Sequence, residues 1–257
     1  MSMDIYNNGT YLENNKTIHS EDSEYKFSYI KKLIKEIDFS NTTVKVLDVG
    51  GGAGLIGKFL CEYIISQNKT VEFYALDLSL KMLEIQKINN KNIVKTYALP
   101  LDELNEKNFD LILMIDVIEH IPNKEITSKL LNTLTKNIIY NIPLELNLFD
   151  RLRNYYMKGN YYKIQTKTIG HIHFFSYLSA LRFVEKYHKL KKYYFADYSS
   201  HILSSSSEEY ISQKNNKLRR LELKISSFLF KYLKIFSPYI IQGSLFILVE
   251  KDDKKSS

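Results

Sequence analysis

The chain has 257 residues with a formal net charge of +7, and 44% of its residues are hydrophobic. This apolar fraction supports a sizeable core and excludes global disorder. No window is apolar over the roughly 18 residues that a membrane-spanning helix needs, and the first residues lack the pattern of a secretory signal. A single cysteine, Cys61, excludes a disulfide framework and a cysteine-based zinc cluster. We therefore expect one cytoplasmic domain, 1–257, and a general lysine enrichment makes its charge weak evidence for a nucleic-acid partner.

Strands and helices alternate along most of the chain. Short apolar or β-branched runs indicate strands at 44–49, 71–76, 93–97, 109–115, 137–141, 192–198 and 245–250. Apolar residues at helical spacing indicate helices at 25–37, 55–66, 79–88 and 177–188, and another after Pro122. This alternation predicts an α/β, Rossmann-like fold with a doubly wound, mostly parallel sheet.

Three segments fall outside this alternation. Residues 1–40 are expected to form an N-terminal lid with one helix, and 144–175, rich in Tyr, Asn and Lys, a loop that serves as a substrate insertion. Residues 205–238 are expected to form a C-terminal helical insertion. Its stretch 208–236 carries apolar residues at helical spacing: Leu218, Leu221, Ile225, Phe228, Tyr232 and Phe236. We favour packing of this stripe on the sheet. The alternatives are a helix that contacts a partner, or peripheral contact with the inner membrane face, which the basic other face would permit.

A glycine-rich turn follows the first predicted strand. Gly50, Gly52 and Gly54 stand between that strand and a helix, where glycines permit positive φ and the helix N-terminus offers free N–H groups. Asp48, two residues before the first glycine, would repel a pyrophosphate but suits a cationic ligand. Asp77 ends the second strand, where a carboxylate can bind ribose hydroxyls in several kinds of nucleotide site. The alternative is a purely structural loop.

The segments VLDVGGGAG, ALDLSLKML and FDLILMIDVIEHIPN resemble class I S-adenosylmethionine-dependent methyltransferases. Within this class, the sequence resembles the group that includes the ubiquinone-biosynthesis O-methyltransferases. The later segment GHIHFFSYLSALRFVEKY resembles the segment that follows strand five in that group. The resemblance covers about residues 44–190. It implies a seven-stranded sheet with an antiparallel last strand, for which 245–250 is the candidate.

By position, the resemblance also implies a set of cofactor contacts. Asp48, Gly50, Gly51, Gly52 and Gly54 would hold the methionine end of S-adenosylmethionine. Asp77 would bind the ribose, and Leu78 and Met82 would lie near the adenine. Many relatives have an acid after the third strand, but this chain has Ala98 and Leu99, so adenine would be held by backbone and apolar contacts. The remaining expected contacts are Ile115 and Asp116.

Methyl transfer to oxygen mainly requires positioning and benefits from a general base. Asp116, Glu119 and His120 have the i, i+3, i+4 spacing that places side chains on one face of a helical turn. In some relatives such a set binds a divalent metal that gathers acceptor oxygens, but we favour a cofactor-side loop without metal.

The candidate catalytic histidines are His120, His171, His173 and His19. His171 and His173 alternate, so both are expected to point the same way, and one of them is a candidate base or completes the His120 site. His19 would reach the pocket if the leader folds over it. The alternative for each is an ordinary packed histidine.

Residues 8–26 resemble the leader of methyltransferases found with bacterial surface-polysaccharide genes, some of them associated with methylated phosphoramidate groups on capsules. The matching positions are Asn8-Gly9-Thr10-Tyr11-Leu12, Asn14, Thr17, His19, Glu21-Asp22-Ser23 and Lys26. The alternative is an ordinary helix lead-in.

The leading hypothesis is an O-methyltransferase of a small or saccharide-linked acceptor, in capsular polysaccharide biosynthesis. A phosphorylated or otherwise anionic acceptor would suit the basic residues of 144–175: Arg151, Arg153, Lys158, Lys163 and Lys167. RNA methylation is an alternative without a visible RNA-binding module. Further alternatives are quinone-ring O-methylation, with 208–236 on the membrane, and a non-catalytic cofactor-binding scaffold. The oligomeric state is left open.

Overall fold

The structure is a computed structural model that describes residues 20–252. Its framework is one seven-stranded sheet with the strand order β3-β2-β1-β4-β5-β7-β6. The strands are β1 (Thr43–Val49), β2 (Thr70–Leu76), β3 (Ile93–Tyr97), β4 (Phe109–Ile115), β5 (Thr135–Leu144), β6 (His188–Ala196) and β7 (Gly243–Lys251). All neighbours are parallel except β7, which runs antiparallel to β5 and β6. The predicted Rossmann-like sheet with an antiparallel last strand is confirmed.

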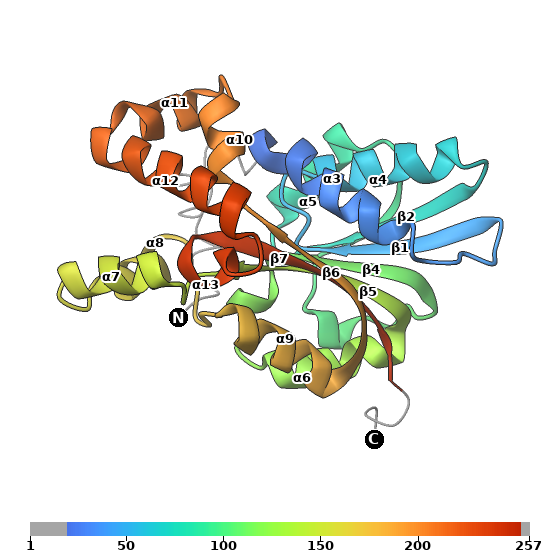
Figure 1. Ribbon diagram of the computed structural model, residues 1–257. Helices are drawn as coiled ribbons and strands as arrows, with labels where there is room; N and C mark the ends of the chain where they lie inside the picture. Colours follow the sequence, from blue (N-terminus) through green and yellow to red (C-terminus); the bar gives the residue numbers. More distant parts are fainter. Residues whose placement is uncertain (1–19, 253–257) are drawn as a thin grey trace.

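Helices cover both faces of the sheet (Figure 1). α3 (Ser23–Ile34) and α4 (Leu55–Ser66) pack on one face, while α6 (Lys124–Leu134) and α9 (Tyr177–Tyr187) pack on the other. α5 (Leu80–Asn89) follows β2 and contacts β2 and β3. Short 3-10 turns are η1 (Ser20–Asp22), η2 (Leu101–Glu103) and η3 (Ile118–His120). This is the doubly wound arrangement that the alternating pattern predicted.

The central strand β4 contributes to both core layers. Leu111 and Leu113 are buried on the side of α3 and α4, and Ile112 and Met114 are buried on the side of α6 and α9. Successive side chains of a strand point to opposite faces, so a strand covered on both faces needs apolar residues at every position. The continuous apolar run at 109–115 therefore follows from the position of β4 in the middle of the sheet.

Two strands are longer than their apolar runs indicated. β5 continues through Pro143 to Leu144, and β6 begins at His188, where the sequence indicated a start at 192. β7 pairs with both strands over these additional residues. The extra length is therefore set by a partner strand far away in the chain, which the local pattern does not display.

The 144–175 segment, whose composition indicated a loop, contains two helices, α7 (Leu148–Tyr156) and α8 (Tyr161–Thr168). The side chain of Asn147 caps α7 by accepting a hydrogen bond from the N–H of Asp150 at 3.0 Å. Such a cap satisfies one of the free donors at a helix start. Local capping thus makes a helix out of a segment that lacks a long apolar pattern.

The C-terminal segment forms four helices between β6 and β7, namely α10 (Ser199–Ser204), α11 (Glu208–Asn215), α12 (Lys217–Leu233) and α13 (Ser237–Ile240). The expected continuous helix is broken at Asn216, whose side chain accepts hydrogen bonds from the N–H groups of Leu218 and Arg219 and so begins α12. Together with α7 and α8, these helices lie beyond the carboxyl ends of the parallel strands (Figure 1).

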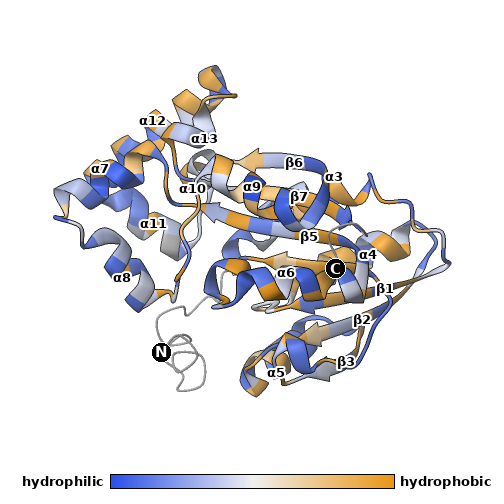
Figure 2. Ribbon diagram, turned by 90° about the horizontal axis from the view of Figure 1, so that it is seen from below, coloured by the Kyte–Doolittle hydropathy of each residue, from blue (hydrophilic) through white to orange (hydrophobic). Residues whose placement is uncertain are grey.

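The apolar stripe of α12 points outward, so the favoured prediction that it packs on the sheet is wrong. Leu218 is 80% exposed and Phe228 is 60% exposed, whereas Leu223 and Ser226 on the opposite side are buried. Apolar and polar residues alternate along α12, as expected for an amphipathic helix (Figure 2). Within 20–252, no helix has the length and apolar character needed to cross a bilayer.

Candidate functional site

The sheet brings most of the predicted site residues to one edge. β1, β2, β4 and β5 are parallel, so their carboxyl ends lie together. Asp48 stands near the end of β1, Asp77 follows β2, Asp116 follows β4 and Glu145 follows β5. Ligands of open α/β sheets bind at this edge. Glu145 was not among the predicted residues, because the sequence indicated a strand end at 141 and β5 continues to Leu144 only through its pairing with β7.

In the turn after β1, Gly50 and Gly51 are required for different reasons. Gly50 has φ of +63° and donates its N–H to the carbonyl of Leu76 at 2.8 Å, a conformation that costs a residue with a Cβ free energy. Gly51 has no such torsion, but a Cβ there would collide with Oδ2 of Asp48. The backbone therefore lies directly over the Asp48 carboxylate.

The Asp48 carboxylate is buried without full pairing. Asp48 is 2% exposed, and its Oδ2 has no hydrogen-bond partner among the described residues. The side-chain amide of Gln86, buried beside the turn, also lacks partners there. Burial and the nearby Asp77 raise the pKa of Asp48 to about 7. A buried carboxylate without full hydrogen-bond pairing fits the cationic amino-acid end of the expected cofactor.

Asp77 and its neighbours form the next part of the predicted cofactor site. Burial raises the pKa of Asp77 to about 6, although the N–H of Ser79 donates to its carboxylate at 2.9 Å. Ser79 also caps α5 by accepting from the N–H of Met82. Met82 is buried in that first turn, while Leu78 is 39% exposed. Asp77 therefore has the place expected for a ribose ligand, and Leu78 offers the accessible apolar surface.

The other predicted cofactor contacts differ in accessibility. Ala98 is exposed, Leu99 is half-buried against the core, and Ile115 is buried at the end of β4. A ligand that lies along the strand ends can reach Ala98 without rearrangement of the core.

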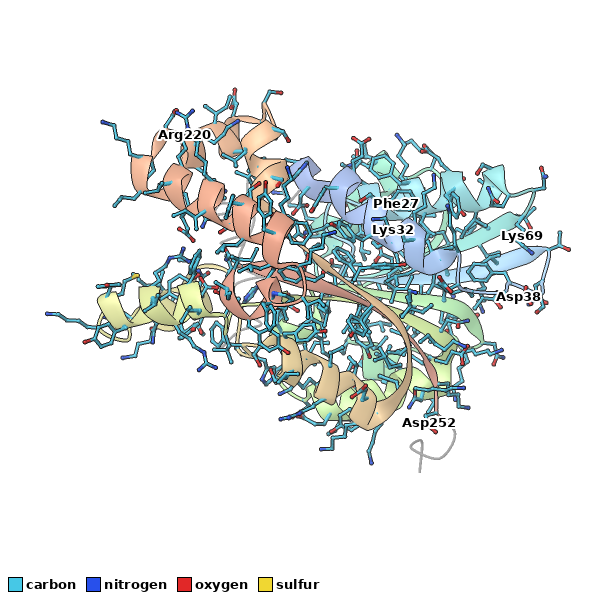
Figure 3. The ribbon with its side chains drawn as sticks, viewed as in Figure 1. Phe27, Lys32, Asp38, Lys69, Arg220 and Asp252 are labelled. Carbon is cyan, nitrogen blue, oxygen red and sulfur yellow. The ribbon has the colours of Figure 1, made fainter. Side chains whose placement is uncertain are left out.

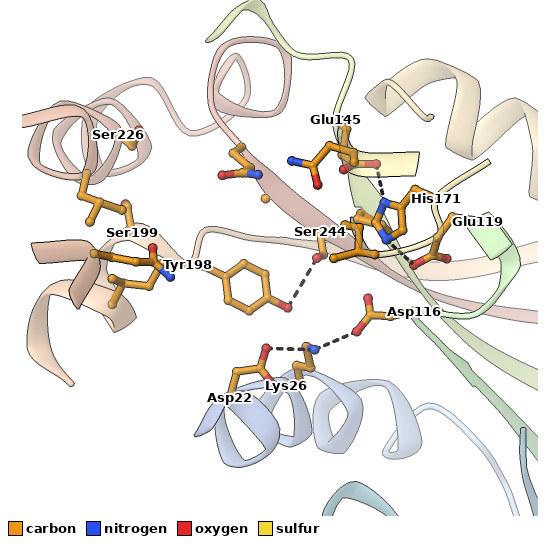
Figure 4. Close-up of a pocket in the computed structure, with 18 of the residues that line it drawn as sticks. Asp22, Lys26, Asp116, Glu119, Glu145, His171, Tyr198, Ser199, Ser226 and Ser244 are labelled. Carbon is orange, nitrogen blue, oxygen red and sulfur yellow. Dashed lines mark hydrogen bonds and ion pairs between the residues drawn. The ribbon is translucent and has the colours of Figure 1, made fainter. Parts of the chain in front are cut away.

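Asp116 lies at the centre of a buried ion-pair network. Its carboxylate accepts from Nδ2 of Asn141 at 2.6 Å and from Nζ of Lys26 at 2.7 Å. Lys26, on α3, is 7% exposed and also contacts Asp22 at 2.9 Å. Burial lowers the pKa of Lys26, but the carboxylates of Asp116 and Asp22 outweigh it and raise that pKa well above its usual value. The pairs tie α3 to the end of β4 (Figure 4).

The prediction that Asp116 shares a helical face with Glu119 and His120 is wrong. Asp116 has φ of +55°, in the left-handed region, and the short helix η3 begins only at Ile118. The turn therefore directs Asp116 toward Lys26 and Asn141. The side chain that joins Glu119 and His120 is His171, and the ligand atoms of these three residues lie within 4.8 Å of one another.

The Glu119 carboxylate faces two imidazoles without a hydrogen bond to either. Its Oε1 lies 3.9 Å from Nε2 of His120 and 3.9 Å from Nε2 of His171. Glu119 is fully buried, and neither of its carboxylate oxygens has a hydrogen-bond partner among the described residues. Burial and the nearby Asp116 raise the pKa of Glu119 well above its usual value.

The partners of the Nδ1 atoms orient both rings. Nδ1 of His120 lies 3.1 Å from the carbonyl oxygen of Gly170, and Nδ1 of His171 lies 2.8 Å from Oε2 of Glu145. The carbonyl and the carboxylate both accept, so each Nδ1 donates and each Nε2 faces Glu119. Two imidazole nitrogens and a buried carboxylate that converge fit a divalent cation, and an acceptor at Nδ1 is typical of metal-binding histidines.

His173 lies apart from this cluster, so the expectation that it points the same way as His171 is wrong. Its Nδ1 is 3.0 Å from Nζ of Lys124, and its Nε2 is 3.0 Å from the carbonyl oxygen of Ile121. The segment is not a regular strand, because the N–H groups of Ile172 and His173 both donate to the carbonyl of Glu119. His19 lies outside the described residues.

A cavity of about 300 Å³ adjoins the network and the cluster. Its wall joins strand ends, α3, α8 and the C-terminal helices, and Figure 4 shows many of the side chains that line it. Lining residues that were not predicted include Glu145, Gln165, Tyr198, Arg219, Glu222 and Gln242. They come from segments far apart in the chain, so no local motif indicated them.

The charge of the cavity wall is mostly negative. Its carboxylates are Asp22, Asp116, Glu119, Glu145 and Glu222, and its cations besides the histidines are Lys26 and Arg219. Arg219 pairs with Glu222 at 2.8 Å, and Lys26 is paired as described above. Among the described residues, none of the five basic residues of 144–175 lines this cavity. Arg153, for example, binds Asp150 at 2.6 Å and Glu222 at 2.5 Å.

Comparison with known proteins identifies the domain and the fold. Residues 47–137 match a family model described as "Methyltransferase domain". No curated protein matches the chain.

Solved structures share the fold at low sequence identity. A SAM-dependent methyltransferase from Thermotoga maritima is 14% identical with a TM-score of 0.57, over 96% of this chain and 100% of that chain. A chain of the complex between the Haloferax volcanii Trm112 methyltransferase activator and a methyltransferase is 10% identical with a TM-score of 0.60. The match covers 98% of this chain and 97% of that chain. Coclaurine N-methyltransferase bound to N-methylheliamine and SAH is 14% identical with a TM-score of 0.54. The match covers 86% of this chain and 72% of that chain.

The domain match and the shared fold together indicate an S-adenosylmethionine-dependent methyltransferase. The protein is an enzyme, its methyltransferase domain includes residues 47–137, and S-adenosylmethionine is its cofactor. Asp48, whose Oδ2 lacks a hydrogen-bond partner among the described residues, lies beneath the glycine turn, and Asp77 follows β2; both remain predicted cofactor contacts.

Proposed function

We propose that the protein methylates a hydroxyl oxygen of a saccharide or of a small saccharide-linked molecule. The observation that supports this proposal is the cavity beside Asp116. The wall of the cavity combines carboxylates with the amides of Gln165, Gln213 and Gln242. Carboxylates accept hydrogen bonds and amides both donate and accept, which suits an acceptor with several hydroxyl groups. The basic residues of 144–175 would have favoured a phosphorylated acceptor, but they lie elsewhere, so the proposal specifies hydroxyl groups.

The cofactor residues have separate tasks in this proposal. S-adenosylmethionine, when bound, supplies an electrophilic methyl group on a sulfonium. Asp48 holds the cationic amino-acid end under the glycine turn, and Asp77 accepts hydrogen bonds from the ribose. Asp116 follows β4 at the same edge of the sheet as Asp48, and it also lines the cavity. In this proposal the methyl group and the acceptor therefore meet beside Asp116. Positioning of this kind supplies much of the rate of a displacement with a good leaving group.

We further propose that Glu119, His120 and His171 hold a divalent cation. An ion at this site would bind an acceptor oxygen and lower the pKa of its hydroxyl. Glu145 and the carbonyl of Gly170 keep the two imidazoles in the orientation that such binding needs. Without an ion, His120 and His171 are the candidate bases, because both imidazoles line the cavity.

The leader resemblance supports surface-polysaccharide biosynthesis as the context. Most of its residues lie outside 20–252, but Asp22 and Lys26 are described and both line the cavity. The resemblance and the proposed acceptor site therefore share Asp22 and Lys26.

Methyl transfer to a defined panel tests the acceptor class. The panel contains neutral mono- and disaccharides, sugar phosphates, quinols, small amines and RNA, with labelled S-adenosylmethionine and mass spectrometry of the products. We expect O-methylation of a saccharide. Gln165→Ala should raise KM for that acceptor and leave cofactor binding unchanged, while the exposed Gln67→Ala serves as the control. Transfer confined to an amine, a quinol or RNA would overturn the proposal.

Titration with Mn²⁺, followed by electron paramagnetic resonance, tests the cation site. Wild type should bind one ion tightly, and Glu119→Gln should weaken binding by about tenfold or more. Glu125→Gln is the matched control, because this carboxylate is exposed and lies outside the cluster. Equal binding by Glu119→Gln and Glu125→Gln, or no binding by wild type, would overturn the proposed cation site.

A further inference from the structure

The outer face of α12 exposes a continuous row of large apolar side chains. On the helix and just beyond its end these are Leu218, Leu221, Ile225, Phe228, Tyr232, Ile235 and Phe236. Ile235 is 81% exposed and Tyr232 is 62% exposed. Those on α12 recur at three- and four-residue spacing and therefore share one side of the helix. A patch of this kind on a protein surface marks an interaction site more often than an isolated apolar residue does.

The opposite side of α12 is already used within the molecule. Leu223 and Ser226 are buried, and Arg219 and Glu222 line the cavity. α12 packs against α10 and α11. The helix is thus anchored by one face, and no segment within 20–252 covers the other face.

Basic residues flank the apolar row on one side. Those exposed along α12 are Lys217, Arg220, Lys224 and Lys231, and Lys234 follows the helix. Arg220 lies on the part of the molecule that stands off the sheet (Figure 3). The one acidic residue of α12 is Glu222, which turns inward to Arg153 and Arg219. The exposed surface of α12 therefore combines apolar and positively charged groups without a carboxylate.

We infer that the outer face of α12, with Ile235 and Phe236, docks the protein on an anionic lipid surface. Apolar side chains can enter the interface between headgroups and acyl chains while the lysines reach phosphate groups. A second copy of the chain fits less well, because a self-complementary contact would bring one basic flank against another without acidic partners. The charge complementarity thus favours a bilayer with anionic headgroups over a dimer.

Docking would place the acceptor cavity next to the bilayer, because the inner face of α12 forms part of its wall. An acceptor carried on a lipid would then reach the cavity from the membrane surface. This consequence rests on the proposed saccharide methylation, whereas the docking itself does not.

Co-sedimentation of the full chain with vesicles tests the inference. Vesicles of phosphatidylcholine alone are compared with vesicles that also contain phosphatidylglycerol, at low and high salt. Wild type should sediment with the anionic vesicles and dissociate as salt rises. The double variant Lys224→Glu/Lys231→Glu should lower the partition coefficient by about tenfold or more, since each basic residue near the surface contributes roughly fivefold. Phe228→Asp should lower it as well.

Matched controls on α6 separate docking from general effects of the substitutions. Ile126 is 64% exposed and Lys129 is exposed, so Ile126→Asp and Lys129→Glu change the same kinds of residue on another helix. These controls should bind vesicles as wild type does. Circular dichroism and calorimetry with S-adenosylmethionine check that each variant is folded.

Three results would overturn the inference. The first is no binding to anionic vesicles by wild type, and the second is equal loss in the α12 variants and the α6 controls. The third is a wild-type dimer, seen by light scattering, that Phe228→Asp makes monomeric. Loss of docking with methyl transfer to soluble saccharides intact would leave the proposed function standing.

Discussion

Replacement of Asp48 by asparagine should weaken cofactor binding and stabilise the cofactor-free protein at the same time. The carboxylate is 2% exposed, Oδ2 lacks a partner among the described residues, and its pKa is raised to about 7 by burial and by Asp77. The charged form is therefore unfavourable in the free protein. It becomes useful when a cationic ligand is bound beside it.

The sign of the stability effect follows from proton linkage. Because the folded-state pKa lies above the usual value near 4, the folded protein binds more protons than the unfolded chain between about pH 4 and pH 7. Stability from this group is present below the unfolded pKa and is lost as the pH rises through 7. At about 1.4 kcal/mol per pKa unit, the loss amounts to up to about 4 kcal/mol. Asp48→Asn avoids it, so its advantage should grow over this range and level off above pH 7.

Cofactor binding should change in the opposite direction. Protonation of Asp48 removes its attraction for the cationic end of S-adenosylmethionine, so the wild-type Kd should rise by roughly 80-fold between pH 7.5 and pH 5. Asp77, with a pKa of about 6, adds a further weakening below pH 6. Asparagine is neutral like the protonated side chain, so in Asp48→Asn the Kd at pH 7.5 should be at least about 80-fold higher, and the dependence near pH 7 should vanish.

Calorimetric titration across this pH range gives the Kd values, and urea unfolding of the cofactor-free protein gives the free energies of unfolding. Asp102→Asn is the control, because Asp102 is an exposed carboxylate on η2. A wild-type Kd that stays constant between pH 7.5 and pH 5 would refute the reasoning. So would an asparagine variant that keeps the full wild-type pH dependence.

Three further predictions concern other parts of the molecule. Gly51→Ala should abolish measurable cofactor binding in calorimetry, since the new Cβ collides with Oδ2 of Asp48, and unchanged affinity would contradict this geometry. Lys26→Met leaves two carboxylates without their buried cation and should lower the free energy of unfolding, measured with urea, by about 3–5 kcal/mol. Lys58→Met, at an exposed ion pair, is the control and should change that free energy by less than about 0.5 kcal/mol. Cys61 is fully buried with its pKa raised to about 12 by burial, so a thiol reagent should label it only after unfolding, and rapid labelling of the native protein would contradict the packing of α4.

The sequence by itself determined the sheet and the placement of the predicted cofactor residues at its edge. Strand runs such as 109–115 and the turn at Asp48 to Gly54 depend on side-chain alternation and backbone torsion, which are local properties. The parallel order of β1 and β2 then brings Asp48 and Asp77 to the same edge. The family resemblance added the antiparallel direction of the last strand, which the local pattern does not contain.

The tertiary structure alone decided the acceptor side. Asp116 pairs with Lys26 and does not join the Glu119 cluster. His171 joins that cluster and His173 does not, which their alternation in the sequence could not predict. The outward face of α12 was equally undetermined, because an amphipathic stripe does not reveal whether another element covers it. These features are contacts between segments far apart in the chain, and their partners are chosen by packing and charge only after the sheet and its helices have formed.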